Sequence, residues 1–349
     1  MKIAFLMVGD LDRLSGGYLY NKKLVEYFIF SGHEVDIVKI PKLPRLIDIV
    51  CNLWFLMILI RKPYDLVLED EMIYPSVFLL NFWLTRRSKV ICLVHMIDWV
   101  EHNNQIKRIF LKIIEGLTLR KCHLIIVNSN YSAALASKLG VTNEQIRMIY
   151  PGHNRFTKML CKDNENIVKL LYVGQYVERK GLRDLINALG KLPNSGWLLD
   201  AVGDDKVDIE YSNSLYETSD ALRISQRVRF HGKVSPKDLN QFYECADVFI
   251  LPTKYEAFGM VVVEAMAHSL PIIAYSVGGV IEQVSDGVNG LLIQKDDINE
   301  LSKSIKSLIE NKDLRRNLGR NGRELSRQFP LWDDTCYTVL QELILLYQS

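Results

Sequence analysis

Short apolar runs alternate with helical segments along most of this 349-residue chain, and that alternation limits the fold more than any other feature. The first run, residues 2–8 (KIAFLMV), is typical of a fully buried strand. A helix over about 18–30 and a strand at 35–40 complete one βαβ unit. Strands that are apolar on both faces occur in parallel sheets covered by helices on both sides. The sequence therefore predicts an α/β fold with doubly wound sheets.

The alternation stops once, between residues 150 and 168 (YPGHNRFTKMLCKDNENIV), where the chain is polar and has no sustained period. Strands then resume at 169–173, 197–202, 228–231, 248–251 and 272–275. A chain of 349 residues is long enough for two domains. We expect a Rossmann-like domain at 1–158, a linker at 159–168, a second Rossmann-like domain at 169–328, and a final helix at 329–349 that packs across the cleft between the domains.

The charge balance differs between the two parts of the chain. Lys and Arg number 21 against 14 Asp and Glu over residues 1–160, and 22 against 27 over 161–349, so the two parts carry +7 and −5. The first part therefore favours an anionic partner. All six cysteines stand singly, which indicates free thiols in a reducing, cytoplasmic compartment. Gly9-Asp10 follows the first apolar run too early for a secretory signal.

Two helical segments in the first part are candidates for contact with a membrane. Residues 46–60 are strongly apolar but fall short of the roughly 20 residues that span a bilayer, so a packed helix is favoured. Residues 105–121 form a basic amphipathic helix whose apolar face either joins the core or lies on anionic lipid. The sequence leaves both alternatives open. The apolar face consists of Ile106, Ile109, Phe110, Ile113 and Leu117.

The stretch 251–279, LPTKYEAFGMVVVEAMAHSLPIIAYSVGG, contains two carboxylates eight positions apart. Glu256 falls in a turn after an apolar strand, and a helix beginning at Gly259 carries Glu264 in its second turn. The N-terminus of such a helix presents unpaired N–H groups that suit a phosphate. A carboxylate repels phosphate but accepts hydrogen bonds from hydroxyls, so Glu264 is expected to face neutral hydroxyl groups.

Other candidates follow predicted strands. The loop 174–181 carries Arg179-Lys180, where two cations suit a diphosphate. With Gly259 and Glu264, these residues indicate a nucleotide diphosphate joined to a sugar, and neither a G-x-G-x-x-G nor a P-loop motif supports NAD or ATP. In the first part, Gly16-Gly17, His95 and Ser129 lie in loops after strands, although turn geometry or exposed surface explains each of these equally well.

Residues 173–292 closely resemble the retaining glycosyltransferases of family 4, which have the GT-B fold of two Rossmann-like domains facing across a cleft. The resemblance rests on G-x5-K-G at 174–181, on the E-x7-E pair with AFG inside it, on EAMA and PIIA, and on GGVIEQVSDGVNGLLI. The first part matches more loosely, through Gly16-Gly17, the sequence HMID from His95, and Ser129.

The resemblance implies a role for each matched residue. Glu264 would hold the ribose and Glu256 the donor sugar, while Lys180 with Arg179 would neutralise the departing diphosphate. His95 would lie near the donor sugar, so that His95, Lys180 and Glu256 form the catalytic set. No metal and no cofactor besides the nucleotide sugar are expected. The other donor-binding residues would be Gly16, Gly17, Gly174, Gln175, Gly203, Val234, Phe258, Gly259, Met260 and Val261.

This chain departs from the family pattern at three positions. Gln175 stands where an arginine is usual, Gly203-Asp204-Asp205 lacks the second glycine of G-x-G, and Ser269 replaces a glycine. The family resemblance predicts hexosyl transfer from a UDP- or GDP-sugar to a hydroxyl of a glycan or lipid-linked glycan in cell-surface polysaccharide or glycolipid synthesis. The expected location is the cytoplasm, with peripheral attachment to the inner face of the cell membrane as a further alternative, and nucleic acid is not an expected partner. Two alternatives are a non-catalytic nucleotide-sugar-binding scaffold and a nucleotide-sugar epimerase.

Overall fold

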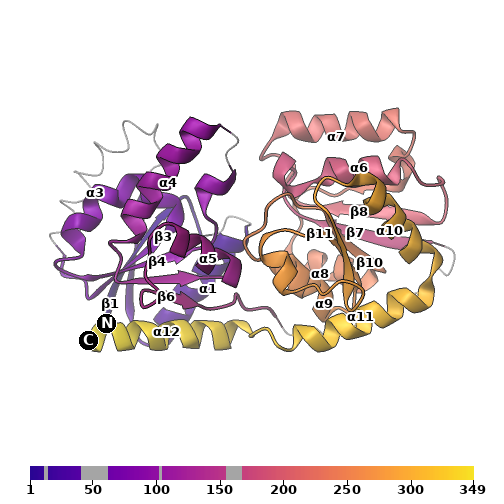
Figure 1. The fold of residues 1–349 in the computed structure, drawn as a ribbon. Coiled ribbons are helices and arrows are strands. Elements are labelled where there is room, and N and C mark those ends of the chain that lie inside the picture. Colours follow the sequence, from indigo (N-terminus) through magenta and orange to yellow (C-terminus); the bar gives the residue numbers. More distant parts are fainter. Residues whose placement is uncertain (12–14, 41–61, 102–103, 155–166) are drawn as a thin grey trace. The chain divides into compact units, whose positions relative to one another are not determined.

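The computed structural model describes residues 1–349 apart from 12–14, 41–61, 102–103 and 155–166 (Figure 1). The chain divides into two compact units: the first joins Met1–Gly152 to Pro330–Ser349, and the second is His153–Phe329. Each unit contains a parallel six-stranded sheet with helices between the strands. The predicted α/β class, with two doubly wound Rossmann-like units, is confirmed.

In the first unit the sheet order is β2-β1-β3-β4-β5-β6. The direction of winding reverses between β1 and β3, and in open α/β sheets such a reversal is where ligands bind. The strands are β1 Lys2–Val8, β2 Glu34–Ile40, β3 Leu66–Asp70, β4 Lys89–Val94, β5 Leu124–Val127 and β6 Ile146–Met148. The helices are α1 Gly16–Phe30, α3 Tyr74–Leu84, α4 Gln105–Leu119, α5 Asn130–Lys138 and α12 Trp332–Gln348, with a short 3-10 turn η1 at Glu71–Ile73.

In the second unit the sheet order is β12-β11-β10-β7-β8-β9, and the winding reverses between β7 and β10. The strands are β7 Val168–Val173, β8 Trp197–Val202, β9 Val228–Phe230, β10 Val248–Leu251, β11 Ile272–Tyr275 and β12 Gly290–Ile293. The helices are α6 Leu182–Leu189, α7 Ile209–Ala221, α8 Pro236–Cys245, α9 Met260–Ala267, α10 Ile298–Glu310 and α11 Lys312–Ser326.

The central strands are buried because both faces of each sheet are covered. Every residue of β10 and β11 is buried, as is almost all of β1. This burial explains why these strands are continuous apolar runs. Helices α7, α10 and α11 were not predicted, yet each has a local signal: its N-cap residue accepts a hydrogen bond from the N–H three residues on. These caps are Asp208, Asp297 and Asn311.

Helix α12 belongs to the first unit, where it lies beside α1 (Figure 1). Thr335 Oγ1 donates to the Tyr150 carbonyl oxygen at 3.0 Å, and Arg147 pairs with Glu342 at 3.0 Å. The chain therefore leaves the first unit near residue 152 and returns to it at Pro330. Most of the expected linker at 159–168, and the whole apolar run 46–60, lie outside the described residues.

The described cysteines differ in state. Cys92, Cys122 and Cys336 are buried free thiols, whereas Cys245 is disulfide-bonded. The expectation of free thiols is therefore wrong for Cys245.

Helix α4 turns its apolar face outward. Ile106 is 82% exposed, and the exposed fractions of Ile109, Phe110, Ile113 and Leu117 are between 41% and 55%. The side of α4 that meets the core is instead made of Leu111, Glu115, Gly116, Thr118 and Leu119. The alternative in which the apolar face of this helix forms core is therefore wrong. Among the described helices none is long and apolar enough to cross a membrane.

Candidate functional site

The second sheet places its candidate residues at the winding reversal. The loop after β7 contains Arg179 and Lys180, and the loop after β10 contains Glu256. Strands β7 and β10 are hydrogen-bonded neighbours, so both loops leave the same edge of the sheet. In open α/β sheets, ligands bind at the carboxyl ends of the strands on either side of such a reversal. The fold thus brings together the two motifs that the sequence places 76 residues apart.

Lys180 and Glu256 form an ion pair at the centre of this edge. Lys180 Nζ lies 2.5 Å from Glu256 Oε2, and the two side chains are only 15% and 14% exposed. Burial alone raises the pKa of Glu256, but the charges of Lys180 and Arg179 outweigh it and leave the pKa below its ordinary value. Glu256 is therefore a carboxylate at neutral pH, and each member of the pair is a charged group held at the edge of the sheet.

Backbone contacts hold the two loops together. Arg179 Nη1 donates to the Tyr255 carbonyl oxygen at 3.0 Å, and the Lys254 N–H donates to the Arg179 carbonyl oxygen at 2.8 Å. Gly181 has φ +72°, and a Cβ there would come within 1.8 Å of the Pro252 carbonyl oxygen. Only glycine permits both that dihedral and that approach. The glycine of G-x5-K-G is thus explained by the closeness of the loops.

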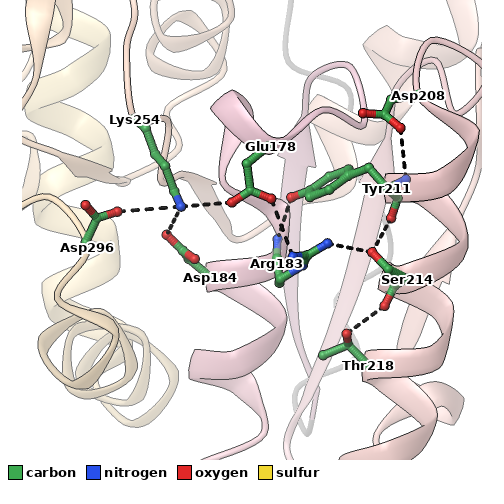
Figure 2. Close-up of polar contacts among 9 residues, drawn as sticks. All are labelled: Glu178, Arg183, Asp184, Asp208, Tyr211, Ser214, Thr218, Lys254 and Asp296. Atoms are coloured by element: carbon green, nitrogen blue, oxygen red, sulfur yellow. Dashed lines mark hydrogen bonds and ion pairs between the residues drawn. The ribbon is translucent and has the colours of Figure 1, made fainter. Parts of the chain in front are cut away.

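A second group of charges is centred on Lys254 (Figure 2). Lys254 Nζ lies 3.0 Å from Glu178 and 3.6 Å from both Asp184 and Asp296. Glu178 and Lys254 stand two residues before Lys180 and Glu256. The two loops therefore form two ion pairs, and the loop after β7 supplies the carboxylate in one pair and the cation in the other. Sequence analysis missed Lys254 and Glu178, although the alternation of sign in E-R-K and K-Y-E was visible.

Helix α9 begins at the N-cap Gly259, the position predicted from the sequence. Gly259 is its N-cap with φ +93°, and the Phe258 carbonyl oxygen accepts from Gln283 Nε2 at 2.5 Å. Glu264 accepts from the Tyr243 hydroxyl at 2.9 Å. Burial raises the pKa of Glu264 to about 7, against a smaller lowering by Tyr243. The carboxyl is therefore close to half ionised at neutral pH.

Two further glycines, which lie within the motif GGVIEQ, support the Glu256 loop. A Cβ on Gly278 would come within 1.9 Å of the Glu256 carbonyl oxygen, and one on Gly279 within 2.1 Å of the Ala257 carbonyl oxygen. The Gly279 N–H donates to the Glu256 carbonyl oxygen at 2.9 Å. The loop that carries Glu256 therefore rests directly on the backbone after β11.

The remaining predicted residues of this unit lie at the same edge. A Cβ on Gly203, after β8, would approach the Gly174 carbonyl oxygen to 1.8 Å, so these two glycines touch. The Gly203 N–H donates to the Gly232 carbonyl oxygen at 2.9 Å, two residues before Val234. Gln175 is partly exposed, and its carbonyl oxygen accepts from the Tyr172 hydroxyl at 3.3 Å. Met260 and Val261 form the first turn of α9.

In the first unit, Gly17 and His95 come together beside the β1/β3 reversal. A Cβ on Gly17 would lie 3.1 Å from His95 Cδ2, so the helix start packs on the imidazole. Gly16 is the first residue of α1, capped by Ser15. His95 Nε2 lies 2.7 Å from Asn21 Oδ1. Ser129 is the N-cap of α5 and follows Asn128, whose Nδ2 donates to the His95 carbonyl oxygen at 2.8 Å.

Buried acids surround His95 in a way that sequence analysis missed. Glu71 accepts from the N–H groups of His95 at 2.6 Å and Met96 at 3.1 Å. Burial, and then the charge of Asp70, raise the pKa of Glu71 well above its ordinary value. Asp70 in turn accepts from Asn21 Nδ2 at 2.6 Å. The sequence E-D-E at residues 69–71, at the end of β3, could have predicted this cluster. Acidic residues are seldom buried unless a ligand or another residue pairs with them.

Family models match both units: Glycosyltransferase Family 4 over residues 17–155 and Glycosyl transferases group 1 over residues 160–325. Two parallel doubly wound units with this edge arrangement define the GT-B class. The chain belongs to the group 1 glycosyltransferases of the family 4 type.

Relatives and solved structures agree with this family. An uncharacterized glycosyltransferase of Methanocaldococcus jannaschii is 36% identical over 46% of this chain and 43% of its own length. The capsular polysaccharide biosynthesis glycosyltransferase CapM of Staphylococcus aureus is 34% identical over 46% and 41%. The chain thus spans under half the length of these two relatives. A second M. jannaschii glycosyltransferase, 24% identical, covers 100% of this chain and 98% of its own.

Two solved structures share the fold. Sucrose-phosphate synthase from Thermosynechococcus elongatus has a TM-score of 0.86 and 22% identity, over 99% of both chains. Anabaena HepE in complex with UDP and glucose has a TM-score of 0.80 and 20% identity, over 97% of this chain and 99% of its own. The GT-B fold predicted from the sequence is confirmed.

Proposed function

We propose that this chain is a retaining glycosyltransferase that moves a hexosyl group from a UDP- or GDP-sugar to a hydroxyl. The observation that carries the proposal is the Lys180–Glu256 pair at the β7/β10 reversal. One member suits a phosphate and the other suits sugar hydroxyls, and both already lie at the edge where ligands bind. HepE, which shares the fold, was crystallised with UDP and glucose, and a nucleotide sugar is the donor class that we assign by this likeness.

The donor would bind along the edges already described. Lys180 and Arg179 would hold the diphosphate, with the N–H groups at the start of α9 directed at its distal phosphate. Glu256 would accept hydrogen bonds from the sugar and Glu264 from the ribose. The backbone at Gly174, Gln175 and Gly203 would approach the diphosphate, and backbone near Val234 would contact the base. With Gln175 in place of an arginine, Arg179 would supply the second cation.

In the proposed reaction, the bond between the anomeric carbon and the diphosphate oxygen breaks as the acceptor oxygen attacks from the same face. The departing phosphate oxygen takes the acceptor proton, and the configuration is retained. Lys180 and Arg179 stabilise the charge that develops on the leaving group. These two cations would do the work of a metal ion, so we propose that the reaction is metal-independent.

Incubation with UDP- and GDP-sugars, followed by measurement of free nucleotide diphosphate and of glycosylated product, tests the proposal. Transfer yields both products, and Glu256→Ala removes them. A non-catalytic scaffold binds donor without release. An epimerase yields an isomerised nucleotide sugar without acceptor. Either of these last two results would replace the proposal.

We further propose that the acceptor is a glycan or lipid-linked glycan at an anionic membrane surface. The support is the α3–α4 face, which we define as the exposed side chains Leu79, Phe82, Trp83, Ile106, Ile109, Phe110, Ile113 and Leu117. Helices α3 and α4, which carry these side chains, pack against each other (Figure 1). Exposed apolar surface of this extent on a soluble domain marks an interaction site.

Charge selects the partner of the α3–α4 face. No acidic residue occurs in α3, and the single acid of α4, Glu115, is buried. Arg86 lies over the Phe82 ring at 4.4 Å, and Lys121 over the same ring at 5.7 Å. Apolar side chains among exposed cations match an anionic lipid surface. The other exposed cations of these helices and their ends are Arg87, Lys107, Arg108, Lys112 and Arg120.

Flotation with vesicles tests this surface. The chain should float with vesicles rich in phosphatidylglycerol and not with pure phosphatidylcholine, and Ile106→Ser with Ile109→Ser should weaken flotation. Phe30→Ser is the matched control, because Phe30 is 89% exposed elsewhere in the same unit. A parent chain that does not float, with a serine pair that lowers the melting temperature, would mean that the face serves the fold and would end the proposal.

A further inference from the structure

His268 ends helix α9, and both nitrogens of its ring face acceptors. Nδ1 lies 2.7 Å from the Glu264 carbonyl oxygen, and Nε2 lies 3.0 Å from Asn240 Oδ1. A carbonyl oxygen can only accept, so Nδ1 carries a proton. The state of Nε2 depends on the other end of the Asn240 amide, whose Nδ2 donates to Glu244 Oε1 at 2.5 Å.

The orientation of the Asn240 amide decides the state of Nε2. A carboxylate has no proton to donate, so the amide nitrogen faces Glu244 and the amide oxygen faces the ring. A flipped amide would set oxygen against oxygen at Glu244. Nε2 therefore also carries a proton, and a ring with two N–H groups is an imidazolium cation. His95 is the opposite case: within the described residues only its Nε2 has a hydrogen-bond partner, and burial lowers the pKa of that ring so that it is neutral at pH 7.

Three features stabilise a cation at this position, although His268 is only 2% exposed. The residue is the C-cap of α9, where the helix dipole is negative. The ring stacks on Tyr243, with 5.1 Å between centroids and 17° between planes. Two carboxylates stand one group further away: Glu244 beyond the Asn240 amide, and Glu264 beyond the Tyr243 hydroxyl.

The other elements packed on α9 bring no opposing charge to this end of it. Helix α11 meets the end of α9 through Gly319 and Gly322, neither of which is charged. Strands β10 and β11 also pack on α9, and neither contains a charged residue. The charged and titratable groups around the ring are therefore those of α8 and of α9 itself.

The ring is coupled to the Glu264 carboxyl through Tyr243. The Tyr243 ring lies against the imidazole, and its hydroxyl donates to Glu264 Oε2 at 2.9 Å. Within the described residues, no group is hydrogen-bonded to Glu264 Oε1. Burial raises the pKa of this carboxyl to about 7, and a neighbouring cation acts in the opposite direction. The carboxyl thus has one oxygen fixed by Tyr243, one oxygen for a ligand, and a cation that favours its ionised form.

We propose that His268 is a cation at neutral pH and is the positioning residue of Glu264, which it holds in place through Tyr243 and keeps ionised for a ribose. The inference rests on the proposed function, in which Glu264 binds the ribose, and every residue in it belongs to the second unit. A neutral ring at this position would leave more of the carboxyl protonated. A protonated carboxyl accepts hydroxyl groups less well.

The first test is the charge of the ring, read by nitrogen NMR on the full chain labelled with ¹⁵N-histidine. The chain has seven histidines, and the signals lost in His268→Gln identify the ring. We expect both nitrogens to be protonated at pH 7, where an ordinary histidine is mostly neutral. In Glu244→Gln the Asn240 amide can turn over, and the ring should become neutral. A neutral ring in the parent chain at pH 7 would overturn the proposal.

The second test is the titration of the Glu264 carboxyl carbon by ¹³C NMR, with Glu264→Gln to assign its signal. The midpoint should move up by about one pH unit in His268→Gln, because the neighbouring cation is lost. Asn240→Leu removes the acceptor of Nε2 and should act in the same direction, which keeps the test available if His268→Gln does not fold. Gln241→Leu, at an exposed position of α8, is the matched control. An unchanged midpoint in Asn240→Leu would overturn the proposal.

The third test is the affinity for UDP, measured by titration calorimetry at two pH values. A shift of about one pH unit lowers the ionised fraction of Glu264 at pH 7 from about one half to about one tenth, so affinity in His268→Gln should fall about five-fold. At pH 9 the carboxyl is ionised in both chains, and the difference should disappear. An equal loss at both pH values would show a merely structural role and overturn the proposal. If UDP does not bind at all, the proposed function fails, while the two NMR results still decide the charge of His268 and its effect on Glu264.

Discussion

The two winding reversals of this molecule are built from different chemistry. At β7/β10 the central contact joins full charges, Lys180 and Glu256, which are held at 2.5 Å by loops that touch through their backbones. At β1/β3 the central contact joins neutral groups, His95 and Asn21, and the charges stand behind them. The same fold thus presents a charged edge in one unit and a neutral edge in the other.

This difference follows from what each edge must bind under the proposed function. A diphosphate needs positive charge that is already in place, because burying a lone cation costs several kcal/mol and pairing it with a carboxylate lowers that cost. A hydroxyl needs only an oriented acceptor or donor, which a neutral ring provides. The predictions below test whether charge dominates the β7/β10 edge.

The largest effect is expected for Lys180→Met. Removal of the cation should lower kcat on the order of 10²- to 10³-fold, because developing charge on the leaving diphosphate loses its nearest counterion. It should also destabilise the fold by about 3 kcal/mol, since Glu256 is left as a buried charge. Steady-state kinetics and thermal melting measure the two effects separately.

The double variant Lys180→Met with Glu256→Gln separates the charge of the pair from its role in turnover. It should restore stability without restoring turnover. Lys191→Met, at an exposed position of the same unit, is the control. A loss below five-fold for Lys180→Met would mean that charge does not dominate this edge.

Gly181→Ala tests the backbone contact that holds the charged edge together. Its φ of +72° is strained for alanine, and its Cβ would lie 1.8 Å from the Pro252 carbonyl oxygen. Gly196→Ala is the matched control, with φ +80° and no heavy atom within 4 Å. We expect about 1 kcal/mol of destabilisation for Gly196→Ala and at least about 3 kcal/mol for Gly181→Ala, measured by denaturant unfolding. Equal values would show that the loops separate freely.

A pH series on Glu264 tests the recognition of hydroxyl groups in the unit that carries the charged edge. The folded-state pKa of about 7 lies above the ordinary value, so the unfolded chain ionises first. Stability is therefore lost as pH rises from about 4.5 to 7, by roughly 3 kcal/mol at most. Glu264→Gln should remove this loss, so that it is more stable than the parent chain at pH 8 and not at pH 5.

Donor affinity should change with pH in the opposite direction. Ribose hydroxyls donate to the ionised carboxylate, so binding of UDP should strengthen by about ten-fold from pH 6 to pH 8, measured by titration calorimetry. Affinity in Glu264→Gln should not vary with pH over this range. An equally pH-dependent affinity in that variant would assign the titration to another group.

Sequence analysis predicted the charged edge better than the neutral one. The alternation of strands, the glycines at 174, 181 and 203, and Glu256 are local patterns, because strand ends, turns and helix starts depend on neighbouring residues. The contact between Lys180 and Glu256 follows once β7 and β10 are adjacent. By contrast, the neutral edge depends on three residues from different elements around His95: Asn21 of α1, Asp70 of β3 and Glu71 of η1. No local sequence pattern predicts that an asparagine in a helix will face the end of a strand.

The outward orientation of the apolar face of α4 could not be predicted from the sequence. Its period of apolar residues indicates an amphipathic helix, but periodicity alone does not say which face meets the core. Here the small and polar side, with Gly116 and Thr118, packs inward: Thr118 donates to the Tyr74 carbonyl oxygen at 3.3 Å, and Gly116 lies close to Leu139. These close contacts, together with the buried Leu111 and Leu119, fix which side of α4 meets the core.

The smallest effect is expected at the Glu178–Lys254 pair, which mirrors Lys180–Glu256 with reversed polarity. Glu178 and Lys254 are 55% and 25% exposed, so their pairing contributes about 1 kcal/mol or less to stability. The pair instead favours one alignment of the two loops, because a shifted alignment would place Lys180 against Lys254 and Glu178 against Glu256. Glu178→Lys should therefore lower kcat three- to ten-fold with little change in melting temperature.

The double exchange Glu178→Lys with Lys254→Glu sharpens this prediction. It re-forms the ion pair, but the loop after β7 then supplies the cation in both pairs. It also sets a carboxylate in place of the ammonium group that now neutralises Asp184 and Asp296. If register depends on the pair alone, the exchange restores turnover. If Lys254 acts mainly by neutralising Asp184 and Asp296, turnover stays low, and adding Asp296→Asn to the exchange should recover it. The kinetics of these three chains decide whether the charged edge is aligned by one pair or by the whole cluster in Figure 2.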